Sequence, residues 1–131
     1  MQAMKSPTWA RRWLIAAAAY NLAWGALVVL SPNSLFVWTD LPLPTYPSIW
    51  QCVGMIVGVY GVGYAVAARD PLRHWPIVLV GLLGKVLGPI GFVQAAMAGD
   101  LPWPFGWTIL TNDLFWWPAF AAILWRAARA R

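Results

Sequence analysis

The sequence predicts an all-α integral membrane protein, a bundle of four transmembrane helices with both termini in the cytoplasm. Hydrophobic residues make up 61% of the 131 residues and charged residues only 10%, whereas a soluble domain usually carries about 25% charged residues. Four long apolar runs follow one another, and basic residues flank them. The chain is too short for two independent cores, so we expect residues 1–131 to form a single membrane domain.

Crossing about 30 Å of hydrocarbon takes about 20 helical residues. We expect spans near residues 13–30, 49–68, 77–98 and 105–125. Arg11 and Arg12 before the first span also suit a signal peptide, but this apolar run exceeds the usual length of about 7–15 residues. We expect it to be retained. The first connection carries four prolines, which argue against any regular element there.

The connections separate by charge. Eight of the nine Lys and Arg residues lie in the N-terminal arm, in the link at residues 69–75 and in the C-terminal tail. The connections at residues 31–48 and 99–104 hold neither Lys nor Arg. By the positive-inside rule, the basic connections are cytoplasmic, which predicts a multi-pass protein of the cell inner (cytoplasmic) membrane. Asp70 and Pro71 are expected to cap and start the third helix.

The eleven tryptophans predict two interfacial belts and a few deep side chains. Trp has an apolar body and one N–H donor, and it collects at membrane interfaces. An outer belt of Trp38, Trp50, Trp103 and Trp107 and an inner belt of Trp13, Trp75 and Trp125 are expected. Trp24 and Trp116 lie deeper and suit either core packing or the wall of an apolar pocket, while Trp117 is expected in the core.

Glycines line one face of each of the two middle spans. Gly54 and Gly58 have small-xxx-small spacing, and residues 81, 84, 88 and 91 follow three-and-four spacing. These faces predict close helix packing within the bundle, or else a homo-oligomer seam or the docking face for another membrane subunit.

Lys85 is the one basic residue inside a span. It lies beside the glycine face, so we expect it to point into the bundle and to have a partner there, with Asp113 as the candidate. Pro89 cannot donate a hydrogen bond to the Lys85 carbonyl, which is left for water, a ligand or a side chain. Pro118 is expected to kink the fourth span and free the Leu114 carbonyl.

Several polar and aromatic side chains are expected at similar depth and form the candidate binding centre. They are Asn21, Trp24, Tyr60, Tyr64, Lys85, Asn112, Asp113 and Trp116. Three interpretations stay open: a buried ion pair that fixes helix register, a small-molecule or proton site, or an Asp113 that reaches the outer interface and never meets Lys85.

Other chemistry is disfavoured by composition. One cysteine and one histidine give no basis for a disulfide, a thiolate cluster or bis-histidine haem ligation, so no metal, haem or iron–sulfur site made by this chain alone is expected. The scattered basic residues do not suit nucleic acid. No nucleophile–base pair, phosphate loop or metal motif occurs, so catalysis is the weaker expectation.

The layout resembles the DoxX-like group of small four-helix bacterial membrane proteins. The similar features are a basic start, a first span ending in Gly25 followed by Ser31 and Pro32, a glycine-rich second span and a short inner link. The resemblance implies a four-helix membrane fold, and some members accompany membrane redox enzymes as subunits. No site residues are carried over, because this chain lacks the cysteines and histidines of a redox role.

Two functions are expected ahead of a third. The chain acts as an accessory or scaffold subunit of a membrane complex, or it binds a lipophilic small molecule such as a quinone, isoprenoid or pigment. The alternative is a compact membrane enzyme of the isomerase or cyclase kind, or a proton-coupled carrier. There Asp113 would act as acid or base and Lys85 would tune it.

Overall fold

The computed structural model describes residues 5–130, and these form helices and connecting turns without a strand. Three helices are long and apolar enough to cross a membrane: α1 (Thr8–Leu30), α3 (Pro47–Ala67) and α4 (Trp75–Ala98). They correspond to the first three expected spans. The all-α class is therefore confirmed, together with three helices of membrane-spanning length.

The expected fourth span is not one helix. Residues 103–129 form η1 (Trp103–Gly106), α5 (Trp107–Asn112), η2 (Leu114–Trp116) and α6 (Trp117–Arg129). The chain leaves the α-helix at Asp113 (φ −122°, ψ −68°), not at a Pro118 kink. Pro118 instead lies in the first turn of α6, where its missing N–H costs nothing. None of these pieces is long enough to cross a membrane alone.

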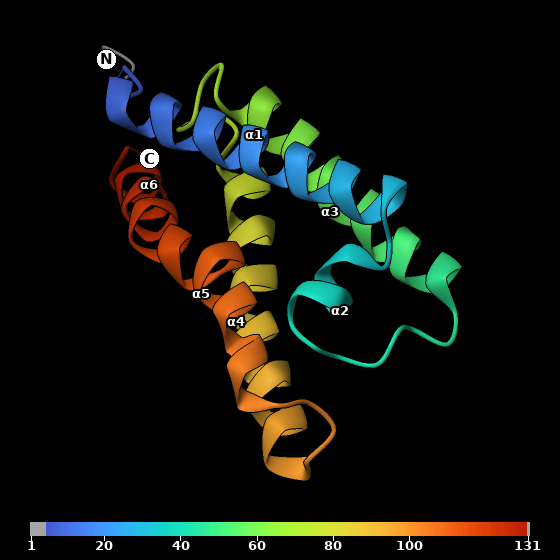
Figure 1. Ribbon diagram of the computed structural model, residues 1–131. Coiled ribbons are helices and arrows are strands. Elements are labelled where there is room, and N and C mark those ends of the chain that lie inside the picture. The colour runs from blue at the N-terminus through green and yellow to red at the C-terminus, as the bar shows by residue number, and fades with distance from the viewer. Residues whose placement is uncertain (1–4, 131) are drawn as a thin grey trace.

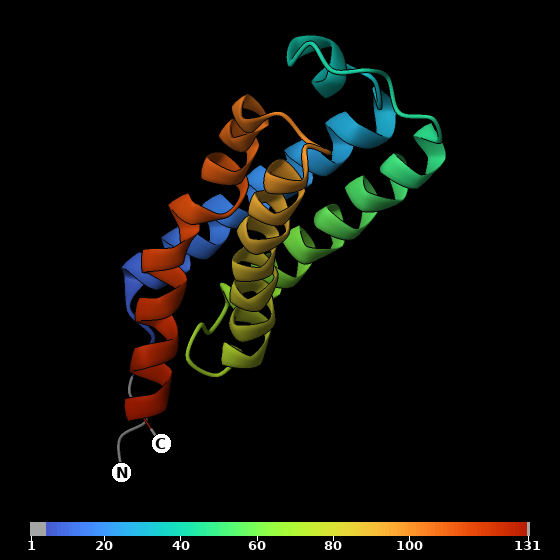
Figure 2. The same ribbon diagram turned by 90° about the horizontal axis from the view of Figure 1, so that it is seen from below.

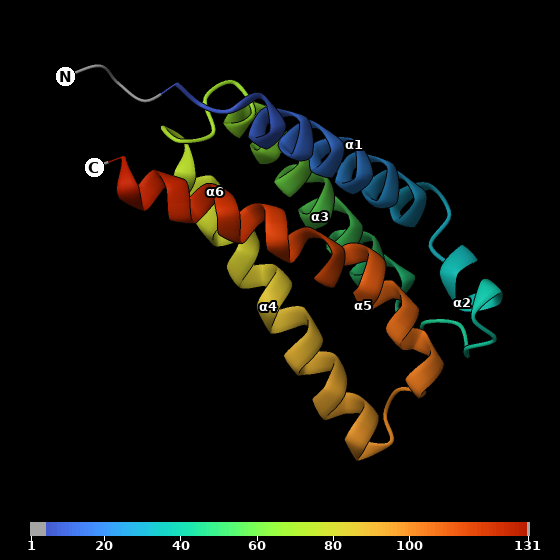
Figure 3. The same ribbon diagram turned by 90° about the vertical axis from the view of Figure 1, so that its left-hand side faces the viewer.

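The helices pack as two pairs. α1 lies along α3, and α4 lies along α6, while α3 and α4 touch near their shared link and then diverge (Figures 1 and 3). Gly25 on α1 makes the first pairing close: a Cβ there would be 2.6 Å from the carbonyl oxygen of Gly54. The glycine pattern of the second span is thus used inside the chain.

The basic ends of the chain meet at one end of the molecule. Arg11 donates hydrogen bonds to the carbonyls of Ala68 and Arg69, both at 3.0 Å, and the two termini lie at that same end (Figure 2). Ser6 donates to the Asp70 carboxylate at 2.5 Å, which holds the pKa of that carboxyl below its ordinary value. Arg131 lies outside the described residues.

Two connections differ from expectation. The proline-rich first connection contains a short helix, α2 (Ser34–Trp38), because its prolines all lie at residue 32 or from residue 42 onward. Residues 71–74 form turns and α4 begins at Trp75, so Pro71 does not start a helix. Asp70 still accepts a hydrogen bond from the Arg73 N–H, at 3.4 Å. At its other end, α4 stops at Gly99, whose φ of 82° suits glycine.

Candidate functional site

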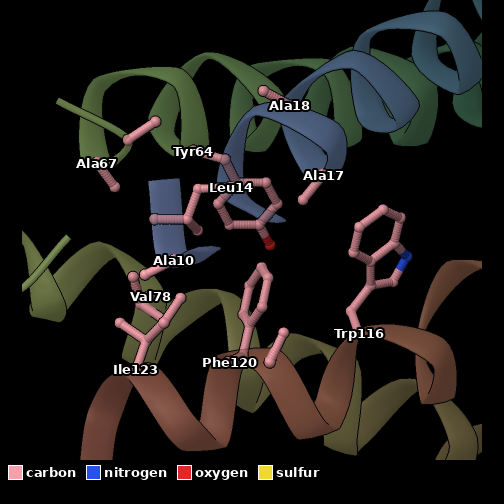
Figure 4. Packing of buried hydrophobic residues seen from close by; sticks show 12 residues of the cluster. Ala10, Leu14, Ala17, Ala18, Tyr64, Ala67, Val78, Trp116, Phe120 and Ile123 are labelled. Atoms are coloured by element: carbon pink, nitrogen blue, oxygen red, sulfur yellow. The ribbon is translucent and has the colours of Figure 1, made fainter. Parts of the chain in front are cut away.

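The core between the two helix pairs is built from small residues on α1 and large ones on α6. Ala10, Leu14 and Ala17 pack against Phe120 and Ile123, and Figure 4 shows these side chains meeting between the helices. Alanines on α1 let the aromatic side chains of the opposite layer approach closely. This core holds the helices that carry the polar residues of the site.

Lys85 is buried, with 6% of its surface exposed, as its place beside the glycines predicts. Its Nζ donates a hydrogen bond to the backbone carbonyl of Asn112 at 2.6 Å. The same ammonium lies 5.8–5.9 Å from the ring centroids of Tyr64, Trp116 and Phe120, within the range of cation–π attraction. Lys85 is therefore stabilised by a carbonyl and three aromatic rings.

Asp113 is not the direct partner of Lys85. No ion pair within 4.0 Å joins the two residues. The Asp113 carboxylate instead lies against the backbone of Gly88 on α4, where a Cβ would be 2.7 Å from its Oδ2. Asp113 interrupts the helix, which turns its side chain toward α4 while the Asn112 carbonyl faces Lys85.

The break at Asp113 leaves carbonyls at the end of α5 that no longer have helical partners, and side chains satisfy them. Lys85 Nζ donates to the Asn112 carbonyl, and Trp116 Nε1 donates to the Thr111 carbonyl at 2.9 Å. Trp117 Nε1 donates to the Lys85 carbonyl at 2.9 Å, so the carbonyl freed by Pro89 takes a side-chain partner. These bonds hold α4, α5 and α6 together.

A cavity of about 290 Å³ lies beside this network. Six of the eight predicted centre residues line it: Asn21, Tyr60, Tyr64, Lys85, Asn112 and Asp113. The remaining lining residues are Ile56 and Val57 of α3 and Gly81 and Gly84 of α4. Ile56, which is 59% exposed, and the exposed Gly84 mark its open side between α3 and α4.

Three polar groups of this cavity have no hydrogen-bond partner within residues 5–130. They are the hydroxyls of Tyr60 and Tyr64 and the carboxylate of Asp113. Tyr64 is the most informative, because only 1% of its surface is exposed while its hydroxyl oxygen is open to the cavity and not fully buried. Its ring extends from α3 toward Phe120 (Figure 4), and a Cβ at Gly81 would be 2.6 Å from its hydroxyl oxygen.

The other predicted residues have structural partners or lie elsewhere. Asn21 donates from Nδ2 to the Val57 carbonyl at 3.2 Å and ties α1 to α3. Trp116 is buried against Trp13, with centroids 5.9 Å apart, and supports Lys85 from outside the cavity. Trp24 is not part of the site, since it packs on Trp50 with ring centroids 5.7 Å apart.

Two residues of the site were not predicted. Tyr20 donates a hydrogen bond to Oδ1 of Asn112 and joins α1 to the end of α5; a hydroxyl inside an apolar span was the signal available for it. Phe120 contributes the third ring around Lys85. Only the folded arrangement distinguishes Phe120 from the many other apolar side chains of the chain.

The chain was compared with known proteins. No protein-family model, no curated protein and no solved structure matches it. The DoxX-like resemblance therefore stays a prediction, and the function has to be argued from the cavity itself.

Proposed function

We propose that this chain binds a lipophilic small molecule, whose hydrogen-bonding group enters the cavity between α3, α4 and the end of α5. The observation that carries the proposal is the hydroxyl of the buried Tyr64 side chain, which is open to the cavity and has no hydrogen-bond partner among the described residues. A hydroxyl that opens into an apolar surrounding without a hydrogen bond costs free energy. A ligand oxygen that accepts or donates there removes that cost.

The surroundings of the cavity favour a lipophile over a water-soluble ligand. Its open side is flanked by α3 and α4, both long and apolar enough to cross a membrane. Both helices also carry exposed apolar side chains, such as Val59 and Val62 on α3 and Leu83 and Leu87 on α4. A molecule dissolved in the bilayer reaches such an opening sideways, and a few polar groups in an apolar wall are typical of ligand sites.

We place the protein in the cytoplasmic membrane with four crossings and both termini in the cytoplasm. The gathering of the basic termini and the α3–α4 link at one end supports this orientation. In the fourth crossing, an interrupted helix is compatible with the bilayer because its freed carbonyls have side-chain donors. Lys85 and Trp116 donate to the carbonyls of Asn112 and Thr111 at the break, and Trp117 donates to the Lys85 carbonyl on α4.

The two alternatives have less support. An accessory subunit would use the glycine faces, of which Gly54, Gly81 and Gly88 already lie against other parts of the same chain, while Gly58, Gly84 and Gly91 remain open. An enzyme with Asp113 as acid or base and Lys85 tuning it has less support because the Lys85 ammonium donates its hydrogen bond to the Asn112 carbonyl and not to the Asp113 carboxylate.

Two glycines of α4 provide a matched test. A Cβ at Gly84 or at Gly91 meets no protein atom within 4 Å, but only Gly84 lines the cavity. Lys85 and the other polar groups are untouched in Gly84→Leu, whose side chain fills the cavity. The wild type, Gly84→Leu and Gly91→Leu are purified gently from the native membrane, and mass spectrometry identifies the accompanying lipids and proteins.

We expect a lipophile at near-stoichiometric amount with the wild type and Gly91→Leu, and its loss with Gly84→Leu. Equal lipid content in all three proteins would refute binding at this cavity. A stoichiometric partner protein that is lost only in Gly91→Leu would support the subunit alternative instead.

A further inference from the structure

A second cavity adjoins the polar one. Val59, Tyr60 and Gly63 of α3 and Pro76, Ile77 and Val80 of α4 line an open surface groove of about 360 Å³. No charged side chain lines this second cavity, which we call the apolar groove. Tyr60 lines both cavities, so its side chain lies between them, and both cavities lie along the same pair of helices.

The two cavities differ in the chemistry they offer. The polar cavity has a cation, Lys85, a carboxyl group, Asp113, and two tyrosine hydroxyls. One basic and one acidic group leave no excess of either sign, which disfavours a charged ligand in a medium of low dielectric. The hydroxyls and the carboxyl group suit an uncharged group that donates or accepts hydrogen bonds.

We infer that the ligand is a neutral lipophile with a hydroxyl or carbonyl head and a single hydrocarbon chain. This inference rests on the proposed function and specifies its ligand. The head binds among Tyr60, Tyr64 and Asp113. The chain passes Tyr60 and lies in the apolar groove, directed toward Pro76 and the α3–α4 link.

The physical roles of the two parts are distinct. Hydrocarbon gains little by moving from lipid tails to an apolar groove, because both are equally apolar. Affinity therefore comes from the head, whose hydrogen bonds form in a site shielded from water. The groove selects by shape, and it fixes which way the chain points.

The test uses a long-chain alcohol as the probe, with a photoactivatable diazirine at one of two positions. One probe has the diazirine next to the hydroxyl, and the other has it in the middle of the chain. Each is added to the purified protein in lipid nanodiscs and irradiated, and the labelled residues are mapped by mass spectrometry. An alkane with the same diazirine but no hydroxyl is the reference.

We expect the head-proximal probe to label Ile56, Val57 and Gly84, and the mid-chain probe to label residues 59–63 and 76–80. Val59→Phe, which narrows the groove, should lower the mid-chain labelling several-fold and leave the head-proximal labelling unchanged. Val62→Phe is the matched control, since Val62 is also an exposed valine of α3 but does not line the groove.

The outcomes separate the two proposals. Head-proximal labelling at the polar cavity with mid-chain labelling scattered over the outer faces of the helices would overturn the groove and leave the proposed function standing. Labelling no greater than that of the alkane at both positions would overturn the proposed function as well. If an unlabelled fatty acid or alkylamine of the same chain length reduced the labelling as much as the unlabelled alcohol does, the inference of a neutral head group would be overturned.

Discussion

Lys85 shows what can be predicted for one residue and what cannot. Its spacing from Gly81 and Gly88 correctly predicts burial, and Pro89 correctly predicts that its carbonyl is left without a helical partner. The sequence predicts Asp113 as its partner, because an unbroken helix would place the two side chains at similar depth. The break at residue 113 brings the Asn112 carbonyl, rather than the carboxylate, to the ammonium.

Replacing Lys85 by Met should destabilise the protein by about 1–3 kcal/mol, the usual cost of leaving a buried carbonyl without its donor. The free energy of unfolding is measured by denaturant titration in mixed micelles. Lys85→Met combined with Asp113→Asn should recover less than half of the loss, because the Asn112 carbonyl still lacks a donor. Full recovery in the double variant would mean that the two charged side chains interact directly.

At the scale of elements, the long spans were predicted well and the last one poorly. The expected spans at residues 49–68 and 77–98 lie within two residues of the ends of α3 and α4, because sustained hydropathy defines them. The segment from residue 103 to 129 is also largely apolar, but it contains Asn112 and Asp113, and its helix breaks at Asp113. The bonds from Lys85 and Trp116 that accompany the break come from the folded arrangement and could not be predicted from the sequence.

The closeness of α1 and α3 leads to a prediction for a matched pair of glycines. A Cβ at Gly25 would lie 2.6 Å from the Gly54 carbonyl oxygen and 3.0 Å from the Cα of Gly58, both backbone atoms that cannot move aside. Gly25→Ala should therefore cost about 1–3 kcal/mol, as overpacking does.

Gly58→Ala is the control for this prediction, because its Cβ meets nothing within 4 Å. It should be neutral or slightly stabilising, since alanine is the better helix former by about 0.5–1 kcal/mol. Thermal unfolding of both variants in detergent measures the difference. If both substitutions lower the midpoint equally, the glycines act through backbone freedom and not through the contact between α1 and α3.

At the scale of the whole molecule, composition and charge predict the class of protein and which of its connections lie together. Low charge and long apolar runs predict a helical membrane protein, and the structure has three helices that suit this. The division of basic residues predicts which connections lie together, and Arg11 does bond to the α3–α4 link. The four-helix bundle and its orientation remain predictions, because the fourth segment is interrupted at Asp113.

The orientation is testable with single cysteines. Cys52, which is exposed near one end of α3, is first replaced by Ala, and Thr45→Cys or Ala130→Cys is then added. Thr45 precedes α3 and Ala130 ends the described chain, and both are exposed.

If the chain crosses the membrane four times with its termini inside, a membrane-impermeant maleimide should label the Thr45→Cys protein in intact spheroplasts. It should label the Ala130→Cys protein only in inverted vesicles. The opposite pattern would reverse the orientation. If both cysteines were labelled from the same side, the segments between them (α3, α4 and residues 103–129) would cross the membrane an even number of times, which would contradict the four-crossing topology.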